Sequence, residues 1–379
     1  MENSERFTAR VVAEFAIALS GGALLICALL ANQQWLDRHF LPSFYFSRST
    51  YVLQASVVRI AIAGLGATLA LVARRRLARF IVYNPARALS VMVVVMLAFG
   101  ATEFILRMRR PRAAMVEEYP LWFEPSRRLD PRLGWVLVPS RIGRDNRGGR
   151  VVEYVTDSAG YRVRRVDEAL DPDRPTIVFT GESMMFGQGL MWDESIPAQT
   201  GSIMGMQSAN VAVSGFASDQ AYLRLQDELP RFRQPVAVVT LFTTILFDRN
   251  LNDDRPHLGP GLVWLPGVHH WRLTMVGKFL VPYRSEETIE RGISVTREVL
   301  QATIALARAR GALPIIVVPQ FTPEDPSERA LRRRILDETG LPYLLVELDP
   351  NWRIPNDGHP DARAAKAIAV AIAARLRER

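Results

Sequence analysis

A serine that follows a hydrophobic segment is the residue around which this sequence is best understood. Ser183 comes after residues 176–180, a run of β-branched and aromatic side chains, and after the pair Gly181-Glu182. Such a run predicts a buried strand that ends close to Ser183. In an open parallel sheet, this end is where ligands bind and where a helix N-terminus favours negative charge. Two roles fit Ser183: a reactive hydroxyl, or the N-cap of the next helix.

An aspartate and a histidine are close together near the end of the chain. Asp357 and His359 lie in the loop 350–360, directly before a predicted helix. Of the five histidines, only His359 is expected at a strand-to-helix junction. The others are next to an apolar segment or in a loop-rich insertion: His39, His257, His269 and His270. An Asp-Gly-His alone is typical of a capped turn, but together with Ser183 it favours a hydrolase-type site.

The segments around these residues predict how the chain brings them together. After Ser183, apolar strands alternate with helices; the strands are predicted at 208–213, 235–243, 313–318 and 343–348, and the helices at 196–206, 219–229, 286–310, 327–338 and 361–377. This alternation predicts an α/β fold, a doubly wound parallel sheet covered on both faces. Right-handed crossovers then place the carboxyl ends of all strands at one edge. Ser183, Gly215, residues 243–252 and the loop 350–360 should meet there.

Three segments of the chain resemble a known family. FTGESMMFGQGL, NVAVSGFASDQ and NDGHPDARAAKAIA are similar to blocks I, II and V of the SGNH (GDSL-type) superfamily of esterases and acyltransferases, over residues 175–379. The resemblance implies a flavodoxin-like fold. It also implies that Ser183 is the nucleophile, His359 the general base and Asp357 the group that orients this base. Gly215, with Ser183, would supply backbone N–H groups to the oxyanion.

The resemblance implies a definite chemistry. A serine hydroxyl becomes a strong nucleophile when an imidazole removes its proton, and the imidazole needs an acceptor on its other nitrogen to hold the useful tautomer. The attacked acyl carbonyl becomes an oxyanion, which fixed N–H groups stabilise. Water would complete hydrolysis, and a sugar hydroxyl would complete acyl transfer. No cofactor and no metal ion are expected.

The sequence departs from the family pattern in two places. Block III of the family supplies an asparagine side chain to the oxyanion. The alignment puts Ile245-Leu246 at that position. In another register, a polar residue nearby would take the place of the asparagine: Thr243, Thr244, Asp248, Asn250 or Asn252. Losing one such donor typically costs ~10²–10³ in rate. Glu182 also stands where the family has aspartate.

The insertion 252–284 contains Trp264, His269, His270 and Trp271. These residues suit a loop that stacks on sugars or binds a metal ion, or a surface loop used for docking.

Composition separates membrane attachment from nucleic-acid binding. The formal net charge of +8 is carried almost wholly by arginine, and the densest clusters, 74–79 and 107–110, border apolar segments. Membrane flanks explain such clusters better than nucleic acid does. The single cysteine, Cys27, excludes an intramolecular disulfide and a cysteine-based zinc site.

Residues 1–112 predict a membrane region. Three segments, 11–30, 51–73 and 88–106, have about the ~20 apolar residues that a membrane-spanning helix needs. A cleaved signal peptide is the alternative for the first, but its apolar stretch exceeds the roughly 7–15 residues of a signal core. Each helix carries one ionisable residue, Glu14, Arg59 or Glu103, which would face another or the interface rather than line a proton path. Residues 113–174 read as a β-rich lead-in that packs on the domain 175–379.

Orientation follows from the arginines between the second and third helices. This short connection contains five, Arg74, Arg75, Arg76, Arg79 and Arg87, and the positive-inside rule places it in the cytoplasm. The C-terminal domain would then lie on the periplasmic side of the inner membrane. The arginines just after the third helix, at 107, 109, 110 and 112, reduce the difference in positive charge between the two sides of the membrane.

Two functions are consistent with the sequence. The first is a membrane-anchored serine esterase or O-acyltransferase that acts on acyl, chiefly acetyl, esters, with an envelope glycan as the substrate that family analogy suggests. The second is a catalytically weakened SGNH-like domain retained as a structural subunit of a membrane protein complex. Acyl transfer together with a membrane acyl carrier would use the same residues as the first.

Overall fold

The computed structural model describes residues 2–42, 48–108, 125–268 and 280–378, together with residues 270, 271, 274 and 277. The chain forms two compact units, one made of Met1–Arg110 and His269–Ile289, the other of Pro111–Val268 and Glu290–Arg379. The insertion predicted at 252–284 is therefore divided between them. His269 and Arg109 to Arg112 lie outside the described residues.

The first unit consists mainly of long apolar helices. Its elements are α1 (Glu2–Leu30), α2 (Gln33–His39), β1 (Phe40–Pro42), α3 (Arg48–Ala67), a π-helical turn (Thr68–Ala73), α4 (Arg74–Tyr83), α5 (Pro85–Met108) and β12 (Tyr283–Ser285). Three helical stretches, Ser4–Leu30, Arg48–Tyr83 and Pro85–Leu106, are long and apolar enough to cross a membrane. This confirms the prediction of three such helices. The arginines expected in a connection at 74–79 instead continue the second helix as α4.

Small residues let α1 and α3 approach closely. A Cβ added at Gly21 would lie 2.6 Å from the carbonyl oxygen of Gly66, so the two backbones are in contact. Close approach through small residues is how helices associate in lipid, where no hydrophobic effect drives them together. Glu14 pairs with Arg10 one turn earlier at 3.0 Å, and Arg59 donates to the carbonyl of Ala28 at 3.1 Å. Glu14 and Arg59 therefore find partners other than each other.

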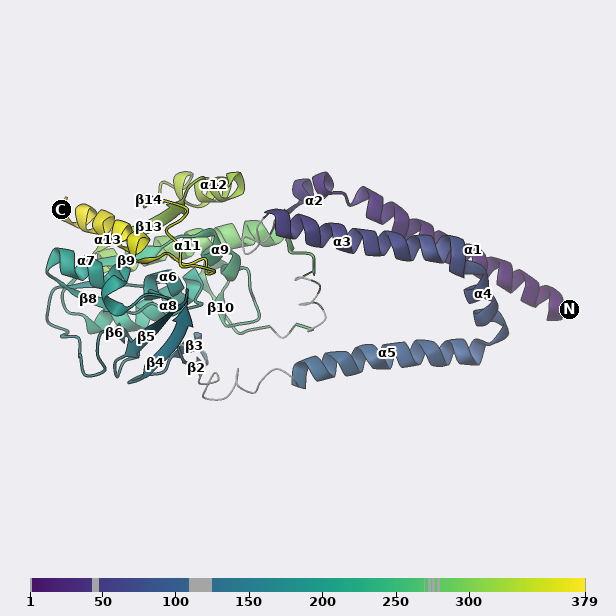
Figure 1. The fold of residues 1–379 in the computed structure, drawn as a ribbon, viewed down its shortest axis with the longest axis horizontal. Coiled ribbons are helices and arrows are strands. Elements are labelled where there is room, and N and C mark those ends of the chain that lie inside the picture. The colour runs from purple at the N-terminus through teal and green to yellow at the C-terminus, as the bar shows by residue number, and fades with distance from the viewer. Residues whose placement is uncertain are drawn as a thin grey trace. The chain divides into compact units, whose positions relative to one another are not determined.

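The second unit is built on an eight-stranded sheet (Figure 1). Five parallel strands form its core: β7 (Thr176–Phe179), β8 (Gln207–Asn210), β9 (Pro235–Leu241), β13 (Leu313–Phe321) and β14 (Leu344–Leu348). Their spatial order is β14-β13-β9-β7-β8, which is the flavodoxin-like order 2-1-3-4-5. The predicted fold class, a doubly wound parallel sheet preceded by three apolar helices, is confirmed.

The lead-in extends this sheet with antiparallel strands. β6 (Arg162–Val163) pairs with β8, and β5 (Arg150–Thr156) and β4 (Ile142–Arg147) follow as a hairpin. β2 (Arg127–Asp130) and β3 (Gly134–Leu137) form a separate two-stranded ribbon, as do β10 (His257–Leu258) and β11 (Trp264–Leu265). The hairpin β4–β5 contributes a residue to the site described below.

Helices cover both faces of the parallel core. These are α6 (Ser183–Phe186), α7 (Ile196–Met204), α8 (Ser218–Glu228), α9 (Thr244–Asn250), α11 (Glu286–Ala309), α12 (Pro326–Arg332) and α13 (Ala362–Arg377). Ile177 and Val239 pack in one cluster with Ile368 of α13, while Val178 packs on the other face with Leu225 of α8. Because successive residues of a strand face opposite sides, a strand apolar at every position needs helices on both.

Candidate active site

Ser183 is the first residue of α6, directly after strand β7. The N-cap of α6 is Glu182, whose carboxylate accepts a hydrogen bond from the N–H of Met184 at 3.1 Å. The interpretation of Ser183 as the N-cap is therefore wrong, because Glu182 is the N-cap of α6. Ser183 is only 3% exposed. Its hydroxyl is thus held by neighbouring protein groups rather than exposed to solvent.

The structure brings His359 and Asp357 to Ser183. His359 Nε2 lies 2.7 Å from Ser183 Oγ, and His359 Nδ1 contacts Asp357 Oδ1. Asp357 Oδ1 also accepts the backbone N–H of His359 at 3.0 Å. An ionised carboxylate can only accept, so Nδ1 carries the proton and Nε2 is left to accept one. This is the relation of hydroxyl, imidazole and carboxylate that activates a serine.

A second acceptor also lies beside the serine hydroxyl. Ser183 Oγ donates to Glu182 Oε2, an oxygen that also accepts Nη1 of Arg249 at 3.2 Å. A hydroxyl has one proton, so at any moment it is directed toward either Glu182 or His359. Nucleophilic attack requires the orientation toward His359.

Arg147 completes the polar chain on the far side of Asp357. Its Nη1 donates to Asp357 Oδ2 at 2.7 Å and its Nε to Asp145 Oδ2 at 2.6 Å. The hydrogen bond from His359 lowers the pKa of Asp357 well below its usual range, with Arg147 adding to this and burial opposing it. Burial works against the charged form of Arg147, but its bonds to Asp357 and Asp145 outweigh this and raise its pKa. The carboxylate is therefore held in its ionised, accepting form.

Local patterning does not reveal the role of Arg147, because its segment DNRGGR, residues 145–150, has the composition of a turn. It is instead the last residue of β4, and Gly148 and Gly149 make the turn with φ of 58° and 80°. Arginine at the end of a hairpin has no characteristic spacing to a residue 210 positions away. Only the assembled sheet places the two together.

The loop that carries His359 rests on the turn that follows Ser183. Ile354 N–H donates to the carbonyl of His359 at 2.9 Å, and Asp357 N–H donates to that of Ile354 at 3.0 Å. A Cβ at Gly189 would lie 2.2 Å from Cδ1 of Ile354, and Gly189 has φ of 81°. Glycine is thus needed at 189 for both space and conformation. This close approach packs the loop that carries His359 against the turn after Ser183.

A buried arginine holds the turn after Ser183 from below. Arg162 is 1% exposed, and its Nη1 donates to the carbonyls of Phe186 and Gly187, both at 2.6 Å, while Nη2 donates to Leu190. Its guanidinium also lies 4.8 Å from the ring centre of Phe186. Burial lowers the pKa of Arg162 to about 10, so the side chain stays charged at neutral pH.

Gly215 lies at the same edge of the sheet, in the turn after β8. The Val213 N–H donates to the carbonyl of Gly181 at 3.1 Å, which joins the chain two residues before Gly215 to the chain two residues before Ser183. Gly215 has φ of 84°, a conformation that favours glycine. Within the part of the chain that the structure describes, the backbone N–H groups of Ser183 and Gly215 donate to no other group. Both suit the stabilisation of an oxyanion.

The segment expected to supply a third oxyanion donor is helix α9. Ile245 is 40% exposed and apolar, and Leu246 is buried. Thr243 caps α9 by accepting from Leu246 N–H at 3.2 Å, and Thr244 Oγ1 donates to Glu328 at 3.0 Å. Asn250 donates to Ser218 and Thr296, at 3.1 and 2.9 Å. Thr244 and Asn250 thus donate to other groups, whereas the cap bond uses Thr243 Oγ1 only as an acceptor.

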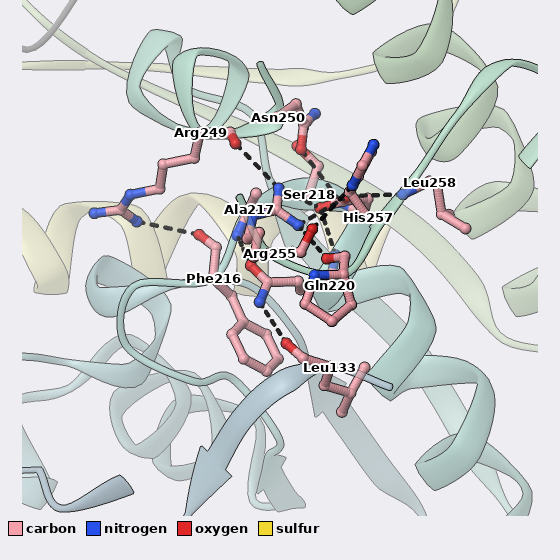
Figure 2. A network of polar contacts seen from close by, with 12 residues as sticks. Leu133, Phe216, Ala217, Ser218, Gln220, Arg249, Asn250, Arg255, His257 and Leu258 are labelled. Atoms are coloured by element: carbon pink, nitrogen blue, oxygen red, sulfur yellow. Dashed lines mark hydrogen bonds and ion pairs between the residues drawn. The ribbon is translucent and has the colours of Figure 1, made fainter. Parts of the chain in front are cut away.

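Arg249 is the residue of α9 that does reach the serine turn. Besides Glu182, its Nη1 donates to the carbonyl of Phe216 at 3.1 Å, the residue after Gly215 (Figure 2). The guanidinium therefore contacts the residue before Ser183 and the residue after Gly215. In the sequence, the role of Arg249 was signalled only by its place in the pair Arg249-Asn250, which aligns with the end of block III. That alignment does not say where the arginine side chain points.

A buried ion pair fixes the backbone around this arginine. Arg255 forms two hydrogen bonds with Asp219, at 2.9 and 3.0 Å, and its Nη2 donates to the carbonyl of Arg249 at 3.0 Å. Asp219 also accepts the N–H groups of Gln220 and Leu258. Figure 2 shows that the network joins the start of α8 to the end of α9. It thereby fixes the backbone of Arg249 relative to the start of α8.

A cavity of about 130 Å³ adjoins the two segments that carry Ser183 and His359. Its lining includes the residues that follow Ser183 and precede His359, namely Met184 and Gly358, as well as Thr244, Ile245, Phe321 and Arg353. A larger cavity of about 740 Å³ is lined by residues from 163–174 and α7, and none of Ser183, Asp357 and His359 lines it. Ser183, Asp357 and His359 do not line the smaller cavity either, but it adjoins the site through Met184 and Gly358, the chain neighbours of Ser183 and His359.

A metal site was one interpretation of the insertion. Among the described residues, no group of three or more His, Cys, Asp or Glu could hold a metal ion, and His269 lies outside them. Trp264 is in β11 and donates from Nε1 to the carbonyl of Arg132 at 3.1 Å. The tryptophan thus anchors the β10–β11 ribbon on the turn between β2 and β3.

Comparison with known proteins gives structural neighbours only. No family model and no curated protein matches this chain. A G-D-S-L family protein from Desulfitobacterium hafniense DCB-2 is 13% identical, with a TM-score of 0.35 over 53% of this chain and 99% of its own. A GDSL-like lipase from Bacteroides thetaiotaomicron VPI-5482 is 15% identical, with a TM-score of 0.33 over 54% and 88%. An acetyl xylan esterase from Butyrivibrio proteoclasticus is 13% identical, with a TM-score of 0.34 over 56% and 65%.

The first two of these neighbours carry the GDSL name of the family that the sequence blocks resemble. At such low identity and TM-score, they say nothing about what this chain acts on. Its function has to be inferred from the geometry of its own site.

Proposed function

We propose that this protein is a membrane-anchored serine esterase or O-acyltransferase. One observation supports this above all: a serine hydroxyl, an imidazole and a carboxylate from loops 176 positions apart form a continuous hydrogen-bonded chain, with Ser183 Oγ 2.7 Å from His359 Nε2. Ser183 is assigned as nucleophile, His359 as general base and Asp357 as the group that orients it.

The reaction follows from these positions. His359 Nε2 takes the proton of Ser183 as Oγ bonds to the ester carbonyl carbon, and the carbonyl π electrons move to oxygen as an oxyanion. The N–H groups of Ser183 and Gly215 stabilise that charge. The intermediate collapses by breaking its bond to the alkoxy oxygen, which leaves with the proton from His359. An acyl-enzyme remains on Ser183.

The acceptor decides whether the enzyme is a hydrolase or a transferase. Water, deprotonated by His359, would release the acid and restore Ser183; a sugar hydroxyl in the same position would become the new ester. The small cavity lined by Met184, the neighbour of Ser183, favours a short acyl group such as acetyl. Three apolar helices would hold the domain at the inner membrane, and the arginines of α4 favour a periplasmic site facing envelope glycans.

Labelling with a fluorophosphonate tests the proposal. The full chain in detergent should form a covalent adduct and hydrolyse a small acetyl ester, whereas Ser183→Ala should do neither. The probe reads the nucleophilicity of Ser183 independently of the natural substrate. Equal labelling of the two proteins, or none of either, would contradict the proposal.

The alternative function, a catalytically weakened subunit of a membrane protein complex, is favoured by one specific observation. Ile245, an apolar residue, occupies the position of the family's oxyanion asparagine, and the hydroxyl of the adjacent Thr244 donates to Glu328. This alternative predicts stable co-purification with partner proteins and no labelling of Ser183. Labelling of the purified chain would exclude it.

A further inference from the structure

We propose that Arg249 acts as the third oxyanion donor of this site, in place of the asparagine that the chain lacks. This inference rests on the proposed serine esterase function and adds a catalytic residue to it. It also explains how a site with Ile245 at the expected position could remain active.

The position of the guanidinium is the first reason. Arg249 Nη1 lies 3.2 Å from Glu182 Oε2 and 3.1 Å from the carbonyl of Phe216. Glu182 precedes Ser183 and Phe216 follows Gly215, so the cation is located between the two turns that provide the backbone N–H donors. An oxyanion bound by those donors would form close to it.

The second reason is that Arg249 comes from the expected segment. It lies one helical turn after Ile245 on α9, and residues four apart share a face of a helix. A long side chain that starts one turn further along can reach the site that a short asparagine at 245 would reach directly. Arg255 pairs with Asp219 and also donates to the carbonyl of Arg249. These bonds fix the end of α9, where the Arg249 side chain starts.

Glu182 gives the third reason. Its carboxylate binds Arg249 and also caps α6, so one residue connects the cation to the first turn after the nucleophile. Glutamate is one methylene longer than the aspartate of the family. We infer that the Glu182 and Arg249 departures from the family pattern belong together, since the longer acid reaches the guanidinium. The pair is mostly buried, with side chains 6% and 19% exposed, which reduces screening by solvent.

The chemistry asks little of the arginine beyond its charge and its donors. As Ser183 Oγ bonds to the carbonyl carbon, negative charge accumulates on the carbonyl oxygen. A guanidinium has five N–H donors in a planar fork, so the same side chain can bind a carboxylate and an oxyanion. Charge-assisted bonds of this kind are stronger than the neutral bond an asparagine makes. No proton is transferred to or from Arg249.

The test compares Arg249→Ala with the unsubstituted protein, using the full chain in detergent and a small acetyl ester. We expect kcat to fall by ~10²–10³, the usual cost of one oxyanion donor, with little change in KM. Inhibition by a boronic acid, which forms a tetrahedral anion on serine, should weaken by a similar factor. Arg249→Met, which keeps the aliphatic stem, should behave like Arg249→Ala and guards against a packing defect.

A rescue variant separates stabilisation of the oxyanion from a structural role. In the Arg249→Ala background, Ile245→Asn should restore the family's own donor and recover at least about tenfold in kcat. The matched control is Arg233→Ala, which removes an exposed ion pair with Asp173 before the start of β9 and should not change kcat.

Two results would overturn the role of Arg249 while leaving the esterase proposal intact. One is an Arg249→Ala protein with kcat and boronic acid affinity within twofold of the original. The other is a loss that appears only in KM, which would make Arg249 a substrate-binding residue. An unsubstituted protein that fails to label with fluorophosphonate would instead refute the esterase proposal, and the role of Arg249 with it.

Discussion

On one side of Ser183 the site is a chain of side chains, His359, Asp357 and Arg147, while on the other it is made of backbone N–H groups and the guanidinium of Arg249. On the first side, His359 and Asp357 match the family pattern and lie in the loop 350–360, whereas Arg147 ends strand β4 and is no part of that pattern. The second departs from it at Ile245 and depends on a buried network around Asp219 and Arg255. The groups that move a proton need a fixed chemical type. Those that stabilise charge can be replaced by any donor that arrives at the same place.

The largest effect is expected on the base side. His359→Ala should lower kcat/KM for an acetyl ester by on the order of 10⁶, because it removes the imidazole that, among the described residues, is hydrogen-bonded to Ser183 Oγ. The activity that remains would measure the oxyanion side alone. A loss of less than about tenfold would show that the Ser183–His359 contact is not used, and His257→Ala serves as a histidine control.

Asp357→Asn should cost about 10⁴ in kcat, because an amide can donate to His359 and favour the wrong tautomer. KM should change little, since Asp357 does not line the cavity. Asp145→Asn is the matched control: it also removes a carboxylate from Arg147 but does not touch His359. Similar losses in the two variants would contradict an orienting role for Asp357.

The support beneath Ser183 can be tested through stability. Arg162→Ala should lower the free energy of unfolding by about 3 kcal/mol or more, since three buried carbonyls lose their donor at roughly 1–3 kcal/mol each. Thermal unfolding and fluorophosphonate labelling of the full chain measure this. Arg164→Ala, which removes only an exposed pair with Asp193, should change the midpoint little. Equal midpoints for the two variants would exclude the proposed support.

Arg147→Gln should have a smaller effect on catalysis. Loss of one charge-assisted hydrogen bond to Asp357, worth about 1.5 kcal/mol, predicts a decrease of roughly tenfold in kcat with KM unchanged. Arg147→Lys should recover part of it, since it keeps the charge without the second bond to Asp145. An unchanged kcat would show that the lead-in hairpin supports only the fold.

The pH dependence of stability is expected to show the smallest effect. The pKa of Asp357 is lowered in the folded state, so its contribution to stability is complete above its unfolded value of about 3.9 and is lost as pH falls through the lower folded value. The difference in unfolding midpoint between the original protein and Asp357→Asn should therefore be constant from pH 5 to 7 and shrink below about 4. A difference that grows on acidification would contradict the lowered pKa.

Hydrophobic patterning predicted most elements of the α/β unit to within a few residues. The helix expected at 219–229 is α8 (Ser218–Glu228), and the one expected at 286–310 is α11 (Glu286–Ala309). Helix α9 was missed because its sequence, TILFDRN, is short and continues the β-branched run of the preceding strand. Short helices gain most of their stability from packing, here the burial of Leu246 and Phe247, and local patterns do not contain that information.

The sequence by itself determined the fold class, the three apolar helices and the meeting of Ser183, Asp357 and His359. Strand and helix periodicity fixes the order of elements, and parallel topology then sends these residues to one edge. Only the tertiary structure decided that Glu182 caps α6, that Arg147 supports Asp357 and that Arg249 reaches the serine turn. Long charged side chains act across distances set by how loops fold against each other, and no spacing along the chain encodes that direction.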